Sequence, residues 1–388
     1  MLGENVMKKV IVKLISIMLI STSLITLVDP IAAESGTTWY VPGDFSTIQD
    51  AIDSDSVNPG DTIYVKSGTY YGGFWVTKAL TIAGEDKDNT IIDLKHTDIV
   101  QTCVDDITIK DFTIINGYNP PDYASYCIYL LQNHNTITGN KIIGDIDGIF
   151  IRGPSSYNTI TDNIIEARSA GINLIKSNNN SIKGNTLRSF IFLNGNDNTI
   201  TGNTCGLISI NGSNNSIKDN TVDGGGISLT SANDNTIADN MCKGTITLDQ
   251  GSNNNSIKDN TITSNFGVSL RSGSNDNTIT GNTITNCVRG IDLIESNKNS
   301  IQGNTITGKK IIFSKIKKEH FGICGIMLKR SSDNTVGGTE TSSKNQISHV
   351  LTGIYFIECS YSRITLRKDN IIRNTLIHIA GLNNKLRN

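Results

Sequence analysis

The sequence of 388 residues predicts an all-β protein, a single-stranded right-handed parallel β-helix with about 22 residues per coil and a short N-terminal capping helix. Three observations predict this class: a recurring asparagine-rich motif, a second motif between its copies, and a composition suited to turns. Aromatic residues make up only 6% of the chain, whereas glycine is abundant at 36 residues and proline is scarce at 6. Such a composition favours short strands joined by many turns.

The recurring motif is N-x-I-x-x-N-x-I, in which an apolar residue follows two positions after each asparagine. The spacing between copies runs from 17 residues (Asn198 to Asn215) to 23 residues (Asn135 to Asn158). The first asparagine of each copy is Asn135, Asn158, Asn180, Asn198, Asn215, Asn235, Asn255, Asn277 or Asn299, and a degenerate copy begins at Asn334.

Between the copies lies the second motif, usually G-I-x-L, as in GIFI (148–151), GISL (226–229) and GIDL (290–293). Each period therefore offers three short strands with apolar residues at every second position, so that each strand has one face to bury. None of these strands buries its face alone, and successive coils are expected to stack around a common core. The chain lacks the leucine signature of leucine-rich repeats and the longer units of helical repeats.

The asparagines are predicted to have a structural role. A bend between two short strands needs a residue that tolerates positive φ, and asparagine is the best candidate after glycine. Asparagine side chains stacked at equivalent positions are also expected to form a hydrogen-bonded ladder. The Gly or Asp that often precedes the second asparagine fits the same bend. The motif is therefore interpreted as scaffold and not as a ligand-binding sequence.

Residues 1–33 are predicted to be an export signal. Early lysines precede an apolar run at 14–28, and Ala32 and Ala33 offer a cleavage point. A retained membrane anchor is the alternative, although the run is short for a bilayer span of about 20 residues. We therefore expect a secreted, extracellular or periplasmic protein with no transmembrane span after signal removal.

The rest of the chain is predicted to divide into three parts. They are an N-terminal cap with the first coils (34–105), the β-helix repeats (106–374) with an insertion at 308–322, and a C-terminal tail (375–388). The apolar spacing at 44–54 predicts the capping helix, with Asp44 or Ser46 as its N-cap. The insertion contains five lysines and is either a solvated loop or a contact for an anionic polymer or lipid.

Two of the seven cysteines, Cys205 and Cys242, occupy positions that Ile or Leu fills in neighbouring repeats. They are predicted to be buried apolar residues. Because they stand two coils apart, their separation is expected to be about 9–10 Å at the usual strand spacing. A disulfide needs Cα atoms within about 7 Å, so no bond between them is expected.

The net charge of −2 gives no electrostatic reason to expect a nucleic-acid partner. Charged side chains gather beside the outward positions of the G-I-x-L strands. The candidate catalytic residues are Asp249, Arg271 and Asp292, and the candidate substrate-binding residues are Arg289, Glu295, Phe192 and Tyr355. An alternative patch contains Asp145, Asp147 and Arg152. Ordinary surface ion pairs are the competing interpretation of both patches.

A copper site needs His, Met or Cys side chains that converge on one place. The best local cluster is His320, Cys324 and Met327, and the other histidines are scattered along the sequence. No metal site is therefore predicted.

The segment STIQDAID, the segment PGDTIYVKSGTYYGGFWVTKALTIAGEDKDNTIID (59–93) and the asparagine coils together resemble the secreted NosD-like proteins of the pectin lyase-like β-helix superfamily. The resemblance covers roughly 37–374 and implies the fold. That superfamily contains polysaccharide lyases, hydrolases and epimerases, surface proteins, and an accessory protein for copper-site assembly in nitrous oxide reductase. In its lyases, acidic residues hold Ca²⁺ and an Arg or Lys acts as the base.

We therefore expect a secreted or cell-surface β-helix protein that binds carbohydrate or serves as an envelope structure. Its expected partner is a polysaccharide or glycan of the cell envelope, and no cofactor is expected. A polysaccharide-active enzyme (lyase, hydrolase or epimerase) is the alternative, and only a lyase would require Ca²⁺. A NosD-like accessory role in copper-site maturation is the second alternative.

Overall fold

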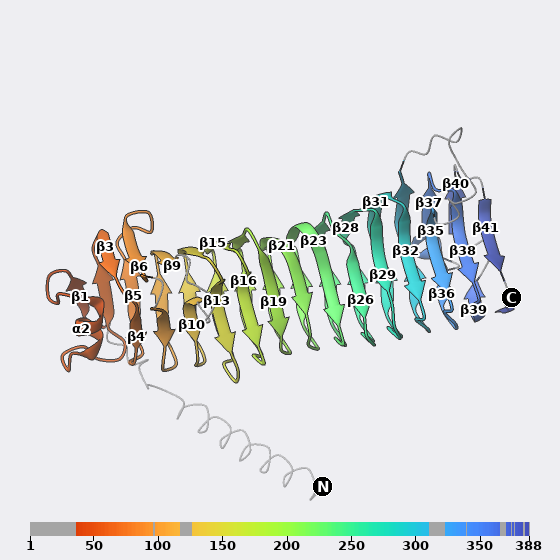
Figure 1. Cartoon of the computed structure of the whole chain (residues 1–388). Helices are drawn as coiled ribbons and strands as arrows, with labels where there is room; N and C mark the ends of the chain where they lie inside the picture. The colour runs from red at the N-terminus through yellow and green to blue at the C-terminus, as the bar shows by residue number, and fades with distance from the viewer. Residues whose placement is uncertain are drawn as a thin grey trace, which may run out of the picture. The chain divides into compact units, whose positions relative to one another are not determined.

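The computed structural model describes residues 36–95, 98–116, 126–309, 323–338, 340–364, 370–373, 375, 377–382 and 385–387. The chain divides into two compact units, Met1–Thr37 and Thr38–Asn388, and every described helix and strand belongs to the second unit. In that unit the strands of each coil pair in parallel with those of the coils before and after (Figure 1). The predicted parallel β-helix is confirmed.

The first wall of the β-helix contains the strands from the first half of each asparagine motif and is one 16-stranded sheet. Its strands are β1 (Thr38–Val41), β2 (Thr62–Val65), β5 (Thr81–Gly84), β8 (Thr108–Lys110), β11 (Thr136–Thr138), β14 (Thr159–Thr161), β17 (Ser181–Lys183), β20 (Thr199–Thr201), β22 (Ser216–Lys218), β24 (Thr236–Ala238), β27 (Ser256–Lys258), β30 (Thr278–Thr280), β33 (Ser300–Gln302), β36 (Thr335–Val336), β39 (Ser360–Ile364) and β42 (Lys385–Arg387).

The second wall comes from the second half of each motif, and the third wall comes from the G-I-x-L segments. The two walls join into one 26-stranded sheet because β21 (Thr204–Ile210) and β23 (Thr221–Thr230) run through both. The other second-wall strands are β3 (Gly68–Tyr71), β6 (Thr90–Asp93), β9 (Thr113–Asn116), β12 (Lys141–Gly144), β15 (Ile164–Ala167), β18 (Thr186–Leu187), β25 (Met241–Cys242), β28 (Thr261–Thr263), β31 (Thr283–Cys287), β34 (Thr305–Gly308), β37 (Asn345–Ser348) and β40 (Asn370–Arg373). The other third-wall strands are β4 (Phe74–Val76), β7 (Val100–Thr102), β10 (Tyr126–Leu130), β13 (Asp147–Arg152), β16 (Ala170–Ile175), β19 (Phe190–Asn194), β26 (Ile246–Asp249), β29 (Phe266–Leu270), β32 (Arg289–Ile294), β35 (Cys324–Lys329), β38 (Thr352–Ile357) and β41 (Ile377–Leu382).

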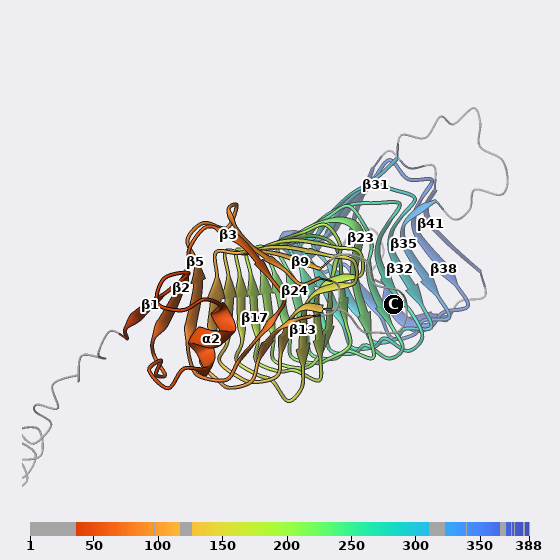
Figure 2. The ribbon, with the colours of Figure 1, turned by 60° about the vertical axis from the view of Figure 1, so that its left-hand side comes forward.

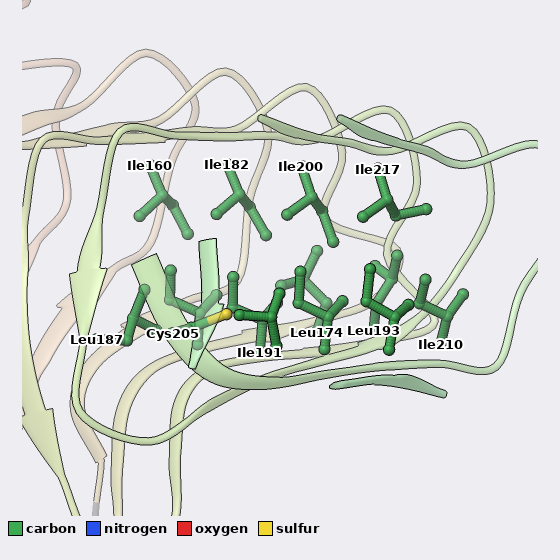
Figure 3. Close-up of a cluster of buried hydrophobic side chains, with 14 of the residues drawn as sticks. Ile160, Leu174, Ile182, Leu187, Ile191, Leu193, Ile200, Cys205, Ile210 and Ile217 are labelled. Carbon is green, nitrogen blue, oxygen red and sulfur yellow. The ribbon is translucent and has the colours of Figure 1, made fainter. Parts of the chain in front are cut away.

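The core consists of columns of inward-facing aliphatic side chains. Figure 3 shows one such column, formed by a single isoleucine from each of four successive first-wall strands. These four side chains, Ile160, Ile182, Ile200 and Ile217, are fully buried. Burying such a side chain stabilises the fold by about 1.5–3 kcal/mol, so each coil gains from the coils on both of its sides.

Two buried asparagine ladders run beside these columns, as predicted. In the first ladder, the backbone N–H of each asparagine donates to the side-chain oxygen of the equivalent asparagine in the next coil. The first of these hydrogen bonds joins Asn135 to Asn158 (2.9 Å), and the last joins Asn299 to Asn334 (2.8 Å). The second ladder runs in the same way from Asn140 to Asn163 (3.0 Å) and across the predicted insertion from Asn304 to Asn345 (3.0 Å). The ladder therefore keeps its register although these last two asparagines are 41 residues apart in sequence.

The predicted conformation of the ladder asparagines is wrong. From Asn135 to Asn334, the residue before each ladder asparagine adopts the positive φ, as Asp259 (φ 56°) does before Asn260 and Asp276 (φ 58°) does before Asn277. Lys344, before Asn345, is the exception with a φ of −79°. The bend turns each asparagine side chain inward, where its amide must find partners because it is buried. Gly and Asp before the second asparagine do occupy the bend, as expected, for example Gly281 (φ 66°).

The glycine of the G-I-x-L motif permits close stacking of the third-wall strands. A Cβ atom on Gly148 would lie only 2.6 Å from the carbonyl oxygen of Gly171 in the next coil. Any larger residue would therefore push the two coils apart.

The predicted capping helix is present as α2 (Ile48–Asp53), which lies at the N-terminal end of the solenoid (Figure 2). It buries Ile48, Ala51 and Ile52. Its N-cap is Thr47, whose side chain accepts from the backbone N–H of Asp50, so the predicted N-cap was wrong. Asp44 instead accepts from the backbone N–H of Tyr40 at 2.9 Å and closes the preceding turn.

All seven cysteines lie in the described part of the chain, and none of them forms a disulfide. Cys205 and Cys242 are buried and both pair in register with Val222, which places them two coils apart as predicted.

Several predicted segments fall partly or wholly outside the described residues. The export signal (1–33), most of the insertion (310–322) with His320, and parts of the predicted tail are among them. Within the tail, β41 and β42 continue the third and first walls, which the sequence did not indicate because the asparagine motif ends earlier. Across the described ranges, no helix is long and apolar enough to cross a membrane.

Removing one rung of the second ladder is expected to destabilise the fold. The Asn260 side chain accepts from the backbone N–H of Asn240 (3.0 Å) and donates to the carbonyl oxygen of Ile237 (2.9 Å). Asn260→Ala leaves the N–H of Asn240 and the carbonyl oxygen of Ile237 buried without these partners. Each unsatisfied buried group lowers the free energy of unfolding by about 1–3 kcal/mol. We expect a loss of at least ~2 kcal/mol, measured as a lower midpoint of urea-induced unfolding.

The matched control is Asn265→Ala, which truncates an exposed asparagine in the same coil. It is expected to change stability by less than about 0.5 kcal/mol. Equal effects of the two substitutions would show that the ladder contributes nothing specific.

Candidate functional site

The outward-facing side chains of the third wall form one continuous column along the β-helix. Strand register aligns Trp75, Gln101, Tyr129, Phe150, Asn173, Phe192, Ser209, Ser228, Thr247, Ser269, Asp292, Met327 and Tyr355. Figure 1 shows the third-wall strands that carry this column lying side by side along the molecule. We call this set of residues the outward column.

An aromatic cluster occupies the column near its N-terminal end. The rings of Tyr126 and Phe150 are stacked, with centroids 4.3 Å apart and planes 5° from parallel, and Tyr129 lies 5.5 Å from Phe150. Phe150 faces outward, but the neighbouring tyrosines cover it, and only 6% of its surface remains accessible.

The central charged cluster of the column surrounds Asp292. This residue was predicted to belong to a surface patch, but it is completely buried. The Nη1 atom of Arg289 lies 3.6 Å from its Oδ2 atom, and Ser269 is its register partner on the preceding strand. Arg271 donates from Nε to the hydroxyl of Ser269 at 3.0 Å. We call Ser269, Arg271, Arg289 and Asp292 the Asp292 cluster.

Burial raises the pKa of the Asp292 carboxyl above its ordinary value, while Arg289, Arg271 and Ser269 partly oppose this change. Neither carboxyl oxygen makes a hydrogen bond of normal length and geometry with the described residues. A buried carboxyl with a raised pKa beside cationic groups is typical of acid–base sites, although structural ion pairs also produce it.

An aromatic side chain borders this cluster. Phe266 pairs in register with Arg289, whose guanidinium carbon lies 5.8 Å from the centre of the phenyl ring. Phe266 is 39% exposed, so the ring and the guanidinium together present an apolar and cationic surface. Ser269 and Phe266 were not predicted as site residues. Their positions in FGVSL, aligned with RGIDL one coil later, would have identified both.

The other predicted site residues lie outside the Asp292 cluster. Asp249 accepts from the backbone N–H of Gln250 at 2.8 Å, and within the described residues it forms no ion pair with Arg271. Glu295 pairs with Arg330 at 2.9 Å beyond the end of β32. Phe192 and Tyr355 belong to the outward column, but they stand five strands before and two strands after Asp292.

The alternative patch is also divided. Asp145 forms an ion pair with Arg168 at 2.8 Å. Asp147 is buried and accepts from the side-chain amide of Asn173 at 2.7 Å, whereas Arg152 is exposed at the end of β13. Buried Asp147 therefore has a structural partner on the next coil.

A pocket of about 690 Å³ lies where the second-wall strands end and the third wall begins. Glu166, Arg168, Arg188 and Phe190 line it together with Asp145. Only Asp145 was noted from the sequence, as part of the alternative patch. The Arg-Ser pairs in EARSAG (166–171) and TLRSFI (186–191), one coil apart, are the sequence feature that would have indicated it.

The chain is also similar to known proteins. The model of a family described as "Periplasmic copper-binding protein (NosD)" matches residues 54–206 and 191–336, which is more than half of the chain. The chain belongs to the NosD family. Among curated proteins, none matches this NosD-family chain significantly.

Several solved structures are similar to this NosD-family protein. The Dettilon tailspike protein has a TM-score of 0.52 and 14% identity, covering 89% of this chain and 68% of the tailspike chain. A tailspike mutant of E. coli bacteriophage HK620 in complex with a pentasaccharide has a TM-score of 0.45 and 12% identity. The match covers 91% of this chain and 73% of the mutant tailspike chain. The PL6 family alginate lyase AlyGC has a TM-score of 0.44 and 14% identity. The match covers 87% of this chain and 53% of the lyase chain. At 14% identity, the likeness to the Dettilon tailspike extends to the fold alone.

The NosD description implies copper, but the described residues do not fit a copper site. Within those residues, no group of three or more His, Cys, Asp or Glu side chains is placed to hold a metal ion. Cys324 and Met327 are buried, and burial raises the pKa of the Cys324 thiol to about 12, which disfavours the thiolate that binds metals. His320, the third member of the predicted cluster, lies outside the described residues.

Asp292→Asn is expected to stabilise this NosD-family protein at neutral pH. Near pH ~3, both the folded and the unfolded chain hold the proton on Asp292, and the substitution should change little. As the pH rises above ~3.9, the unfolded chain loses this proton more easily because the folded pKa is raised, and folding stability falls. Asparagine does not ionise and avoids this loss.

The measurement is the difference in unfolding midpoint between parent and variant from about pH 3 to about pH 7. A variant that becomes less stable than the parent as the pH rises would show that Arg289 and Arg271 outweigh burial and that the pKa is lowered instead.

Proposed function

We propose that this protein is a carbohydrate-binding β-helix protein of the cell envelope that holds a glycan polymer along its outward column. The single observation that carries the proposal is the Asp292 cluster with Phe266. It sets cationic and aromatic groups beside a stretch of the column that bears hydroxyl groups, at Ser209, Ser228 and Thr247. The periplasmic description of the family and the predicted export signal at 1–33 support an envelope location.

The shape and chemistry of the column suit a polymer. Solenoids use extended surfaces that follow the stacking of their repeats. Here Ser209, Ser228 and Thr247 present hydroxyl groups on successive coils, at a spacing of about 4.8 Å. Hydroxyl groups in such a row hydrogen-bond to sugar hydroxyls, and the half-buried Phe192 and Tyr355 supply apolar surfaces for sugar rings.

In this proposal the charged groups select the glycan. Arg289 and Arg271 present guanidinium groups that pair with carboxylate or sulfate groups in a bidentate manner. Asp292 lies beneath Arg289 and holds it in place through their ion pair. Phe266 provides the neighbouring apolar surface.

A second candidate function is polysaccharide cleavage, and the environment of Asp292 favours it. A carboxyl with a raised pKa beside Arg271 resembles an acid–base pair. In this reading Asp249, Arg271 and Asp292 are the catalytic residues, and Arg289 and Glu295 bind substrate. A lyase among these enzymes would use Ca²⁺ to neutralise uronate carboxylates.

The binding proposal predicts retention by polysaccharide gels. The chain without residues 1–33 is run through gels containing polygalacturonate, alginate or a neutral glucan. We expect retardation by at least one polymer, and we expect Arg289→Ala to weaken binding to an acidic polymer by about tenfold, since a charge-assisted hydrogen bond contributes about 1.5–3 kcal/mol.

Lys258→Ala is the matched control because it also removes one positive charge, from an exposed residue on the first wall. It should leave binding unchanged. Retardation by none of the polymers, or equal loss in the two variants, would contradict the proposed use of the outward column.

The enzyme alternative predicts turnover of the same polymers. New double bonds are followed by ultraviolet absorbance and new reducing ends by a colorimetric assay, both with added Ca²⁺. Turnover that disappears in Arg271→Ala or Asp249→Ala supports catalysis at this cluster. Binding without turnover supports the binding protein, and turnover unaffected by either variant excludes these residues as catalysts.

A further inference from the structure

The pocket at the end of the second wall has features of a built binding site. Its volume of about 690 Å³ lies within the range of about 300–1,000 Å³ that is usual for small-molecule sites. Its lining comes from four successive coils, namely from β9, β12 and β15 and from the residues that directly follow β12, β15 and β18, and β19 adds Phe190. It is five second-wall strands away from the coil of Asp292, or about 24 Å at the usual strand spacing.

The charges of the pocket are only partly neutralised. Asp145 pairs with Nε of Arg168 at 2.8 Å, which fixes the direction of that guanidinium. Glu166 and Arg188 lie on adjacent coils and are both exposed. Neither forms an ion pair with the residues that the structure describes. The pocket therefore presents one cation and one anion that remain available to a ligand.

Two buried polar atoms in the pocket lining also lack partners among the described residues, namely Oδ1 of Asn116 and Oγ of Ser189. Asn116 is only 4% exposed, and its amide nitrogen donates to the carbonyl oxygen of Tyr126 at 3.1 Å. That bond fixes the side chain and leaves its oxygen as an unused acceptor. Buried polar atoms usually have partners, so these two indicate a polar ligand that is bound when the site is filled.

Apolar side chains complete the lining. Ile115 and Ile143 are half-buried, outward-facing residues of β9 and β12, and Phe190 at the start of β19 is also half-buried. Aliphatic and aromatic surfaces of this kind pack against the C–H face of a sugar ring. A simple anion such as phosphate would leave these surfaces unused.

We propose that this pocket binds an acidic sugar, a uronic acid unit at the end or on a branch of a glycan. Arg188 takes the carboxylate in a bidentate pair, assisted by the terminal nitrogens of Arg168. Glu166, Asn116 Oδ1 and Ser189 accept hydrogen bonds from ring hydroxyls, and Phe190 packs against the ring. This site does not depend on the Asp292 cluster, because the residues of the two sites lie on different coils.

The experiment titrates the chain without residues 1–33 with trigalacturonate, with neutral maltotriose and with glutarate, by isothermal titration calorimetry. Trigalacturonate is expected to bind and to weaken with added salt, while the other two bind at least about tenfold more weakly. Binding of maltotriose as tight as that of trigalacturonate would overturn acid recognition. Equal binding of glutarate would reduce the site to a carboxylate site that does not recognise sugar.

Variants then locate the site. Arg188→Ala is expected to weaken trigalacturonate binding by about tenfold or more, and Arg188→Lys by less, because lysine keeps the charge and loses the bidentate pair. Arg373→Ala removes an exposed arginine from the far end of the same wall and should leave the affinity unchanged. Circular dichroism confirms that each variant is folded.

Two results would overturn the proposal, namely no binding of trigalacturonate at millimolar concentration, or affinity that Arg188→Ala leaves unchanged. Arg289→Ala separates this site from the outward column. Under the present proposal the pocket still binds trigalacturonate in Arg289→Ala, and any binding that this variant loses belongs to the outward column, whereas loss of all trigalacturonate binding in Arg289→Ala would assign the acidic sugar to the Asp292 cluster.

Discussion

The hydrogen bond from each ladder asparagine to the next is the interaction on which the rest of this structure depends. A coil of the β-helix has three bends, and each bend interrupts the strand pairing that satisfies backbone groups. At two of the bends, a buried asparagine gives its backbone N–H to the oxygen of the next asparagine and donates its own amide to nearby carbonyls, as Asn282 does to Ile257 at 3.0 Å. The same contacts therefore satisfy the bend and fix the register between coils.

Much of the fold was predictable because the ladder constrains the sequence in every coil. The alternation of apolar residues predicted three strands, and the recurrence of asparagine predicted their stacking. The conformation of the bend was harder to predict, since both Asp259 and Asn260 tolerate a left-handed backbone. Burial decides between them: the inward amide needs several partners, so the preceding residue takes the strained conformation. Thr47 was missed as the helix N-cap for a similar reason, because Asp44, Ser46 and Thr47 are all competent caps.

The candidate sites were less predictable because they depend on distances between coils of unequal length. Alternation correctly indicated that Asp292 faces outward, but it carried no information about burial, which Ser269, Met327 and the arginines determine together. The pocket beside β15 and β18 required knowing that residues after the second asparagine motif turn a corner at the same place in successive coils. The ladder asparagines themselves are excluded as ligand-binding groups, since their hydrogen-bonding capacity is used within the scaffold. Function is therefore expected where the repeat varies, at Asp292 and at Arg188.

The central claim, that the asparagine ladders hold the coils in register, is tested most directly by amide hydrogen exchange on the intact protein. The backbone N–H groups of Asn220, Asn240 and Asn260 donate to side-chain oxygens and not to strand partners. The account predicts that these amides exchange as slowly as those of the core strands, with opening free energies close to that of global unfolding. Exchange as fast as in the exposed segments would contradict it, since the ladder would then open without the coils coming apart.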